Sequence, residues 1–284
     1  MTSADDAIPE DALADIDYLS RSANRVAILN GLADGATTRR ELADRTGVSR
    51  ATLDRIVNEF EERGWAERTP DGEYVATAAG VHVVREFRPF VESVAAVERL
   101  GEAVAWLPTD ELDIGLHEFG DATVRRPEND DPAEAVEFMT GLLRESDEFR
   151  TLNHLLPPGI FERVLHDQVV SGELSVEAVT TRDVVDYFVE SPGRRERWRD
   201  VLEAGTPLFY RDPPIPCNLL LFDDLVLIKR SDTGPIDDSY GVPIVSENEA
   251  VLSWAHDLID RYRADAVRVD TRTLTEVGAA SDER

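Results

Sequence analysis

The sequence is poor in lysine, cysteine and long apolar runs. Lys229 is the only lysine and Cys217 the only cysteine among 284 residues. A single cysteine excludes an internal disulfide bond and a zinc site built on cysteines. No apolar run approaches the ~18 residues that a membrane span needs, and residues 1–17 are acidic and lack a signal-peptide core. We therefore expect a cytoplasmic protein without a membrane partner.

Acidic residues dominate the charge. The 58 Asp and Glu residues outnumber 30 Lys and Arg, which gives a net charge of −28, while 42% of the residues are hydrophobic. This apolar content predicts a packed core rather than a disordered acidic chain. An acidic, lysine-poor protein suits a cytoplasm with molar salt, in which the Debye length falls to about 3 Å. The composition therefore indicates a haloarchaeal source.

Residues 37–65, TTRRELADRTGVSRATLDRIVNEFEERGW, predict two helices joined by a tight turn. Thr38 and Glu41 have the spacing of a capping box, Gly47 breaks the first helix, and Ser49 is suited to cap the second. The apolar residues of the second helix fall at i, i+3, i+4 and i+7, which places them on one stripe: Leu53, Ile56, Val57 and Phe60. This pattern alone also fits an ordinary helical hairpin with a polar outer face.

The residues after the second helix separate these two interpretations. Asp71-Gly72 lies between two short runs of alternating residues and predicts a β-hairpin. Helix, turn, helix and hairpin in this order resemble the winged-helix domains of archaeal and bacterial transcription regulators. The resemblance implies that the second helix enters the major groove of double-stranded DNA. We predict this domain at residues 13–77, after a flexible leader at 1–12, with its first helix at 13–32.

The polar residues off the buried stripe are the candidate DNA contacts. The first set is expected to reach base edges or nearby phosphates: Ser49, Arg50, Thr52, Arg55 and Asn58. The second set is expected to contact phosphates only: Arg39, Arg40 and Arg68. Between Tyr18 and Pro70, nine arginines face eight acidic residues for a net charge of +1, so the other 231 residues carry −29. The region with the DNA-binding pattern is thus the least acidic part of the chain.

Residues 78–106 predict one long helix, with Pro89 expected to kink or restart it near Arg88. Its apolar residues alternate spacings of four and three, as in a heptad seam: Val83, Phe87, Phe90, Val94, Val97, Gly101 and Val104. We interpret this seam as a homodimer contact, because operators with two-fold symmetry need a paired protein. The alternative is a linker helix that packs onto the chain's own second domain.

Residues 107–269 alternate strand and helix patterns and contain a late hairpin whose turn is Asp223-Asp224. We predict an α/β domain with a mixed sheet, and thus an α+β chain overall. The expected elements include a strand at 112–116 and a final helix capped by Ser246 and Glu249. Residues 270–284 are expected to be a disordered tail.

Several short motifs of this second domain resemble one family. They are Leu155-Leu156-Pro157 and Glu177-Ala178-Val179-Thr180 before helices, the run from Leu219 to Asp224, Trp254-Ala255 and Tyr262. They resemble the C-terminal domain of archaeal winged-helix regulators that include the regulator of filamentation and methanogenesis. A more distant likeness is to sugar-sensing regulators of the TrmB type, whose effector domain resembles phospholipase D. The resemblance implies a sensor or interaction domain, and it assigns no ligand-binding residue.

The phospholipase-D likeness raises a hydrolase hypothesis that the residues do not support. That chemistry needs a His-x-Lys motif, and Lys229 has no histidine two residues before it. Five histidines lie scattered without metal-ligand spacing: His82, His117, His154, His166 and His256. Cys217 precedes an apolar strand and is expected to be buried rather than reactive. We therefore expect no enzyme, no metal and no cofactor.

Four arginines lie close together on one predicted helix: Arg194, Arg195, Arg197 and Arg199. They fit either an anion site or, with the acidic residues between them, a solvated face with i, i+4 ion pairs. We favour the solvated face.

The sequence as a whole predicts a homodimeric, sequence-specific transcription regulator. A small molecule or a protein bound to the second domain would act by changing the separation or tilt of the two recognition helices through residues 78–106. The alternative from another class is a winged-helix adaptor that binds a protein and not DNA.

Overall fold

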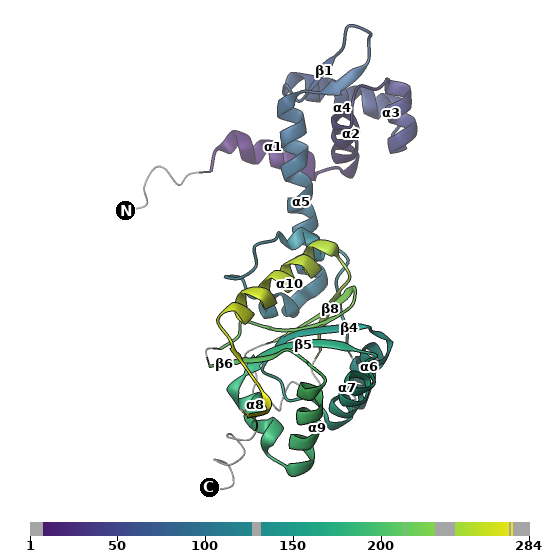
Figure 1. The fold of residues 1–284 in the computed structure, drawn as a ribbon. Coiled ribbons are helices and arrows are strands. Elements are labelled where there is room, and N and C mark those ends of the chain that lie inside the picture. The colour runs from purple at the N-terminus through teal and green to yellow at the C-terminus, as the bar shows by residue number, and fades with distance from the viewer. Residues whose placement is uncertain (1–7, 127–131, 213, 231–241, 273, 275–284) are drawn as a thin grey trace, which may run out of the picture. The chain divides into compact units, whose positions relative to one another are not determined.

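The computed structural model describes residues 8–126, 132–212, 214–230, 242–272 and 274. The chain divides into two compact units, Met1–Glu92 and Ser93–Arg284 (Figure 1). Helices and strands are mixed, which confirms the predicted α+β class. The boundary between the units falls inside a helix, α5 (Ala78–Leu100), so this helix contributes residues to both.

Four helices build most of the first unit: α1 (Glu10–Ser20), α2 (Ala23–Ala33), α3 (Arg39–Thr46) and α4 (Arg50–Glu62). The prediction of a single helix at 13–32 is wrong, because α1 ends at Ser20 and α2 begins at Ala23. Ser22 has an extended backbone, with φ −156° and ψ 116°, which interrupts the helical hydrogen-bond ladder. Residues 10–12 of the predicted leader belong to α1, and residues 1–7 lie outside the described part.

The helix–turn–helix has the predicted caps. The Thr38 side chain accepts a hydrogen bond from the backbone N–H of Glu41 at 3.2 Å, and the Thr38 N–H donates to the Glu41 carboxylate at 3.0 Å. Gly47 ends α3 in the left-handed region, with φ 68°, which glycine adopts without steric cost. Ser49 caps α4 by accepting from the N–H of Thr52 at 3.4 Å.

A short hairpin follows α4 and forms the predicted wing, from β1 (Ala66–Arg68) to β2 (Tyr74–Ala76). The next helix, α5, includes Pro89 and continues to Leu100, so the expected restart near Arg88 does not occur. A proline removes one backbone donor, and the rest of a 23-residue helix maintains the ladder. Gly101, with φ 55°, begins the 3₁₀ helix η1 (Gly101–Trp106).

The second unit is built on one eight-stranded sheet with the order β10-β6-β5-β4-β7-β8-β9-β3. Strands β4, β5 and β6 run parallel, and the other pairings are antiparallel, so the sheet is mixed as predicted. The strands are β3 (Thr123–Val124), β4 (Glu148–Asn153), β5 (Ser175–Thr181), β6 (Leu208–Arg211), β7 (Asn218–Phe222), β8 (Leu225–Lys229), β9 (Ile244–Ser246) and β10 (Val267–Arg268).

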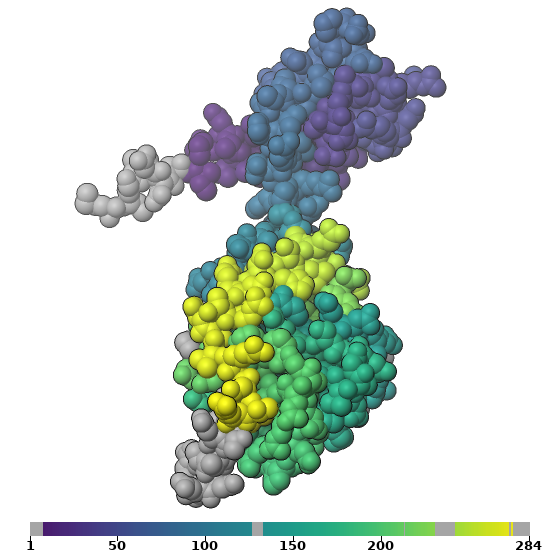
Figure 2. Space-filling model, viewed as in Figure 1, coloured from purple at the N-terminus to yellow at the C-terminus, as the bar shows by residue number. Residues whose placement is uncertain are grey.

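Helices cover both faces of this sheet (Figure 1). One face carries four helices: α6 (Pro132–Glu145), α7 (Gly159–Ser171), α8 (Arg182–Val189) and α9 (Pro192–Glu203). The other face carries α10 (Glu249–Ala264), which forms a continuous surface in the space-filling view (Figure 2). Because side chains alternate along a strand, Phe149 of β4 packs under the four helices and Leu152 packs under α10.

Two predicted elements of this unit are wrong. Residues 112–116 form no strand, and the 3₁₀ helix η2 (Leu116–Phe119) begins at their end. Asn248, not Ser246, caps α10, since its side-chain oxygen accepts from the N–H groups of Ala250 at 2.8 Å and Val251 at 3.2 Å. Ser246 is the last residue of β9, too early in the chain to reach these donors.

The predicted tail begins too early. Strand β10 pairs with β6 at the edge of the sheet, and Leu274 beyond it is 2% exposed in the core under α6–α9. A leucine side chain buried in this way contributes about 1.5–3 kcal/mol to folding, which explains why the chain continues to pack past residue 269. Residues 273 and 275–284 lie outside the described part.

Candidate nucleic-acid interface

Helix α4 has one buried face and one exposed face. Its apolar stripe is at most 1% exposed and anchors the helix in the core of the first unit: Leu53, Ile56, Val57 and Phe60. Of the predicted base contacts, Ser49, Arg50, Arg55 and Asn58 are exposed, and Thr52 is half-buried. The local periodicity therefore orients the predicted residues outward. Their side-chain contacts differ, so some are freer than others to bind a ligand.

Arg50 is the cation of α4 with the greatest freedom to bind a ligand. It is exposed at the first residue of the helix, and within the described residues no ion pair to it occurs. The helix start also carries a partial positive charge from its unsatisfied N–H groups. An anion or a guanine edge near this point would meet a guanidinium with its donors unused.

The other cations of the interface already have partners. Arg55 forms an ion pair with Glu59 at 2.8 Å on the same helix. Arg39 lies 3.0 Å from Asp54, donates to Asn58 at 3.4 Å, and stacks over the Tyr74 ring. Arg39 is therefore better placed to tie α3 to α4 and the wing than to contact phosphate.

These contacts also pair two of the four acidic residues of α4. Asp54 is paired with Arg39, and Glu59 accepts hydrogen bonds from Arg55 and from the Tyr18 hydroxyl at 2.5 Å. The Tyr18 bond is the main cause that lowers the pKa of Glu59, while burial and the Glu59 contact raise the pKa of Tyr18 to about 12. A paired carboxylate repels a phosphate less than a free one, so the acidic content of the helix is less unfavourable than its sequence indicates.

Sequence reasoning did not find the role of Tyr18. Its ring lies between two guanidinium groups, with Arg25 at 3.9 Å and Arg63 at 4.1 Å from the ring centroid. Together with the bond to Glu59, this arrangement ties α1 to the candidate recognition helix α4. Tyr18 and Glu59 are 41 residues apart, and no local pattern in the sequence links them.

The remaining predicted contacts are weaker candidates. The Ser49 and Thr52 hydroxyls are 3.0 Å apart and hydrogen-bond to each other. Arg40 is exposed on α3, with only a long contact of 4.0 Å to Asp44. Arg68 folds over the wing loop and donates to the Gly72 carbonyl at 3.4 Å.

The wing is poorly suited to a phosphate backbone. Its loop carries Asp71 and Glu73, and Arg68 is the only basic residue between 66 and 76. Carboxylates at a loop tip repel phosphate, so α4 and the exposed Arg40 of α3 are better candidates for DNA contacts than the wing.

The predicted seam on α5 is divided by the structure. Phe87 is 7% exposed in the core of the first unit, so its side chain is not free to contact a second chain as predicted. Val83 is half-buried against the same core, and Val104 packs against the core under α10. Apart from Gly101, three seam residues remain exposed, and we call them the α5 stripe: Phe90 at 58%, Val94 at 46% and Val97 at 42%.

The four arginines of α9 are not a simple solvated face. Arg194 and Arg197 reach Glu162 of α7, a carboxylate that is 2% exposed, at 3.3 and 3.4 Å. Trp198 donates to the same carboxylate at 2.8 Å. The i, i+4 pair of Arg194 with Glu190 is longer, at 3.6 Å. This part of the cluster holds α9 on α7 and does not form an open anion site.

Residues suited to catalysis or metal binding are few. Cys217 is fully buried, as predicted, and burial is the main cause that raises its pKa. No group of three His, Cys, Asp or Glu side chains able to hold a metal occurs in the described part of the chain. Among the helices that the structure describes, none is both long and apolar enough to cross a membrane.

Two family models match the chain, one mainly over the first unit and one within the second. Residues 13–99 match the HVO_A0261 N-terminal domain, and residues 132–265 match the middle domain of the methanogenesis regulatory protein FilR1. The chain therefore resembles archaeal winged-helix regulators in both of its parts. The resemblance inferred from the sequence motifs is confirmed, and the second unit matches a domain of a regulatory protein.

Solved structures resemble this chain only loosely. TrmBL2, described as an archaeal chromatin protein with a novel mode of DNA binding, covers 89% of this chain and 98% of its own, at 15% identity and a TM-score of 0.39. The match to the dimethyltransferase RosA from Streptomyces davawensis covers 72% of this chain and 65% of RosA, at 14% identity and a TM-score of 0.26. An O-methyltransferase family protein from Burkholderia thailandensis has the same coverage and TM-score at 11% identity. TM-scores this low assign neither a fold family nor a function to the chain. No curated protein matches the sequence.

Proposed function

We propose that this regulator binds specific sites on double-stranded DNA as a homodimer, with α4 in the major groove. The observation that carries the proposal is the exposed Arg50 at the start of a helix whose own Asp54 and Glu59 are paired inside the domain. Arginine binds the O6 and N7 acceptors of guanine through two parallel hydrogen bonds. Arg50, Ser49 and Arg55 would supply base contacts, and Arg40 would supply a phosphate contact.

High salt makes the base contacts more important. Phosphate binding is driven largely by the release of counterions, which weakens steeply as the salt concentration rises. In molar KCl, hydrogen bonds to base edges therefore contribute a larger share of the affinity than they do in dilute buffer. This agrees with an interface that has a net charge of only +1 between Tyr18 and Pro70.

The DNA-binding proposal is tested by replacing Arg50 with alanine. One lost bidentate contact costs about 1–3 kcal/mol, so the Kd for a selected duplex should rise about 5- to 150-fold. The measurement is fluorescence anisotropy in molar KCl, with duplexes enriched from genomic fragments by the unmodified protein. Arg21→Ala is the matched control, because Arg21 is an exposed arginine directly after α1 that is paired with Asp17. Equal affinity of the two variants would contradict the assignment of α4.

The homodimer is expected to form through the α5 stripe. Its exposed Phe90 and Val94 lie on the same face of α5, one helical turn apart. The Phe90→Glu/Val94→Glu variant should sediment as a single 31.6 kDa chain, and the unmodified protein should sediment at twice that mass. Ala95→Glu, at an exposed position of α5 outside the stripe, should remain dimeric. An unmodified protein that sediments as a monomer at micromolar concentration would exclude this contact.

A protein-binding adaptor is the second candidate function, and the acidic wing loop favours it. In that case the purified protein would carry no genomic fragments, and selection would enrich no duplex. We propose no hydrolase activity. The second domain would regulate DNA binding by responding to a bound molecule.

A further inference from the structure

The second unit contains a cavity between its sheet and the helices α6–α9. Its volume, measured as the space open to the centre of a water molecule, is about 70 Å³. One water needs roughly 10–15 Å³ by the same kind of measure, so the space suits a small organic molecule. The cavity is partly open to solvent, next to Leu156, Pro157 and Pro158.

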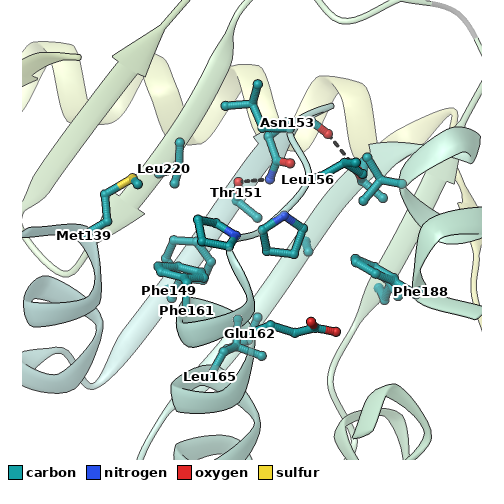
Figure 3. Close-up of a pocket in the computed structure, with 18 of the residues that line it drawn as sticks. Met139, Phe149, Thr151, Asn153, Leu156, Phe161, Glu162, Leu165, Phe188 and Leu220 are labelled. Atoms are coloured by element: carbon teal, nitrogen blue, oxygen red, sulfur yellow. Dashed lines mark hydrogen bonds between the residues drawn. The ribbon is translucent and has the colours of Figure 1, made fainter. Parts of the chain in front are cut away.

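Most of the cavity wall is apolar. The rings of Phe149, Phe161 and Phe188 lie around it in Figure 3, together with Leu165 and Leu220. Such a wall binds the hydrocarbon body of a ligand by removing its surface from water, at about 25 cal/mol for each Å² buried.

Polar groups collect where β4 and β5 end. Asn153 of β4 donates from its side-chain amide to the Thr151 hydroxyl at 2.5 Å, and the Thr180 hydroxyl of β5 donates to the Asn153 carbonyl at 2.7 Å (Figure 3). An amide has two N–H donors, and the second donor of Asn153 has no partner among the described residues. Parallel strands of α/β sheets commonly place ligand-binding groups at this end.

The only lysine of the chain lines the same cavity. Lys229 is the last residue of β8, is 1% exposed, and pairs in register with Asn218 of β7. The N–H of His154, the residue after β4, donates to the side chain of Asn218 at 2.9 Å. The last residues of β4 and β8 and the first residue of β7 therefore lie at the same end of the sheet. Lys229 also interacts with another group of the chain, so a ligand would bind it in addition to that partner.

We propose that this cavity binds a small apolar monocarboxylate, of the size of benzoate or hexanoate. The hydrocarbon part lies among the phenylalanine rings, and the carboxylate accepts hydrogen bonds from the Lys229 ammonium and the Asn153 amide. A buried ammonium favours an anion over a neutral group of the same shape, because the local dielectric is low. The inference deepens the proposed regulatory role, since such an acid would be the effector, but binding itself does not depend on DNA.

The single lysine permits a direct test on the full chain. Protein labelled with ¹³C only at the Cε atom of lysine gives one carbon signal, and Lys229→Met identifies it by removing it. Titration with benzoate and with hexanoate in molar KCl should shift this signal in a saturable way. Benzamide, which has the shape of benzoate without its charge, should bind at least tenfold more weakly.

Variants separate the cavity from the rest of the unit. In calorimetric titrations Lys229→Met should weaken benzoate binding at least tenfold. Ala178→Leu, which fills the cavity from β5, should abolish the benzoate shift while the lysine signal persists. Val170→Leu, at a position of α7 that is 51% exposed, should bind as the unmodified protein does.

Two results would overturn the proposal. The first is the absence of a saturable shift with both carboxylates, and the second is equal binding of benzoate and benzamide. Arg50→Ala protein should still bind benzoate, because α4 belongs to the other unit. If the unmodified protein binds benzoate but no duplex, only the proposed function is wrong, and if it binds a duplex but neither carboxylate, only the ligand assignment is wrong.

Discussion

Gly80→Ala is expected to destabilise the winged-helix unit by about 3 kcal/mol or more, at the upper end of what overpacking costs. A Cβ atom at Gly80 would lie 2.0 Å from the backbone oxygen of Trp65 and 2.9 Å from its carbonyl carbon. Backbone atoms cannot move aside as a flexible side chain does. The same carbonyl accepts a hydrogen bond from the N–H of Thr77 at 3.0 Å, which further fixes its position. The start of α5 therefore has to separate from the wing.

The measurement is urea denaturation in molar KCl, followed by hydrogen exchange of amides in residues 23–76. Gly141→Ala is the matched control, because Gly141 lies within α6 and a Cβ there would meet no atom within 4 Å. That substitution should stabilise the second unit by about 0.5–1 kcal/mol. Unchanged exchange in Gly80→Ala would mean that α5 does not begin against Trp65.

Removal of the Glu162 carboxylate should have the second large effect. Glu162→Ala leaves Arg194, Arg197 and the Trp198 indole without their shared acceptor. Breaking a buried pair by removing one partner costs about 3–5 kcal/mol. Arg194 and Arg197 keep 18% and 31% of their side-chain surface exposed, so water offsets part of the loss and we expect about 3 kcal/mol. The unfolding midpoint of the second unit reports this change.

Glu190→Ala supplies a control that uses the same arginine. Glu190 is 68% exposed and lies 3.6 Å from Arg194, so its removal should cost less than about 1 kcal/mol. Glu162→Gln keeps an acceptor for Trp198 and should fall between the two. Equal midpoints for Glu162→Ala and Glu190→Ala would show that burial of the carboxylate adds nothing to its contribution.

The elements that the sequence predicts well are those with local signals. Helix α4 is defined by the Ser49 cap and by a stripe ending at Phe60, and the hairpin is defined by Asp71-Gly72, all within 25 residues. These signals depend on backbone geometry and on burial of one face, and neither requires a partner distant in sequence. The same signals oriented the predicted DNA contacts outward.

The failures involve partners distant in sequence. The pattern of α5 predicts a seam, but it does not indicate that Phe87 is buried in the core of the first unit. The arginines of α9 likewise do not indicate their partner Glu162, which lies 32 residues before Arg194. Asn248 and Ser246 are both suitable caps, and only the end of β9 decides between them. One local signal does point to the cavity, because a lysine at the end of the apolar run Leu225–Lys229 is unusual for a buried strand.

The burial of Cys217 has a practical consequence for studying the two proposals. The chain's only thiol is fully buried and its pKa is raised, so it reacts poorly with maleimide or methanethiosulfonate reagents. A cysteine introduced at an exposed position becomes the single reactive site without further mutation. A spin label at position 61 on α4 would then measure, by pulsed electron resonance, the distance between two recognition helices with and without benzoate.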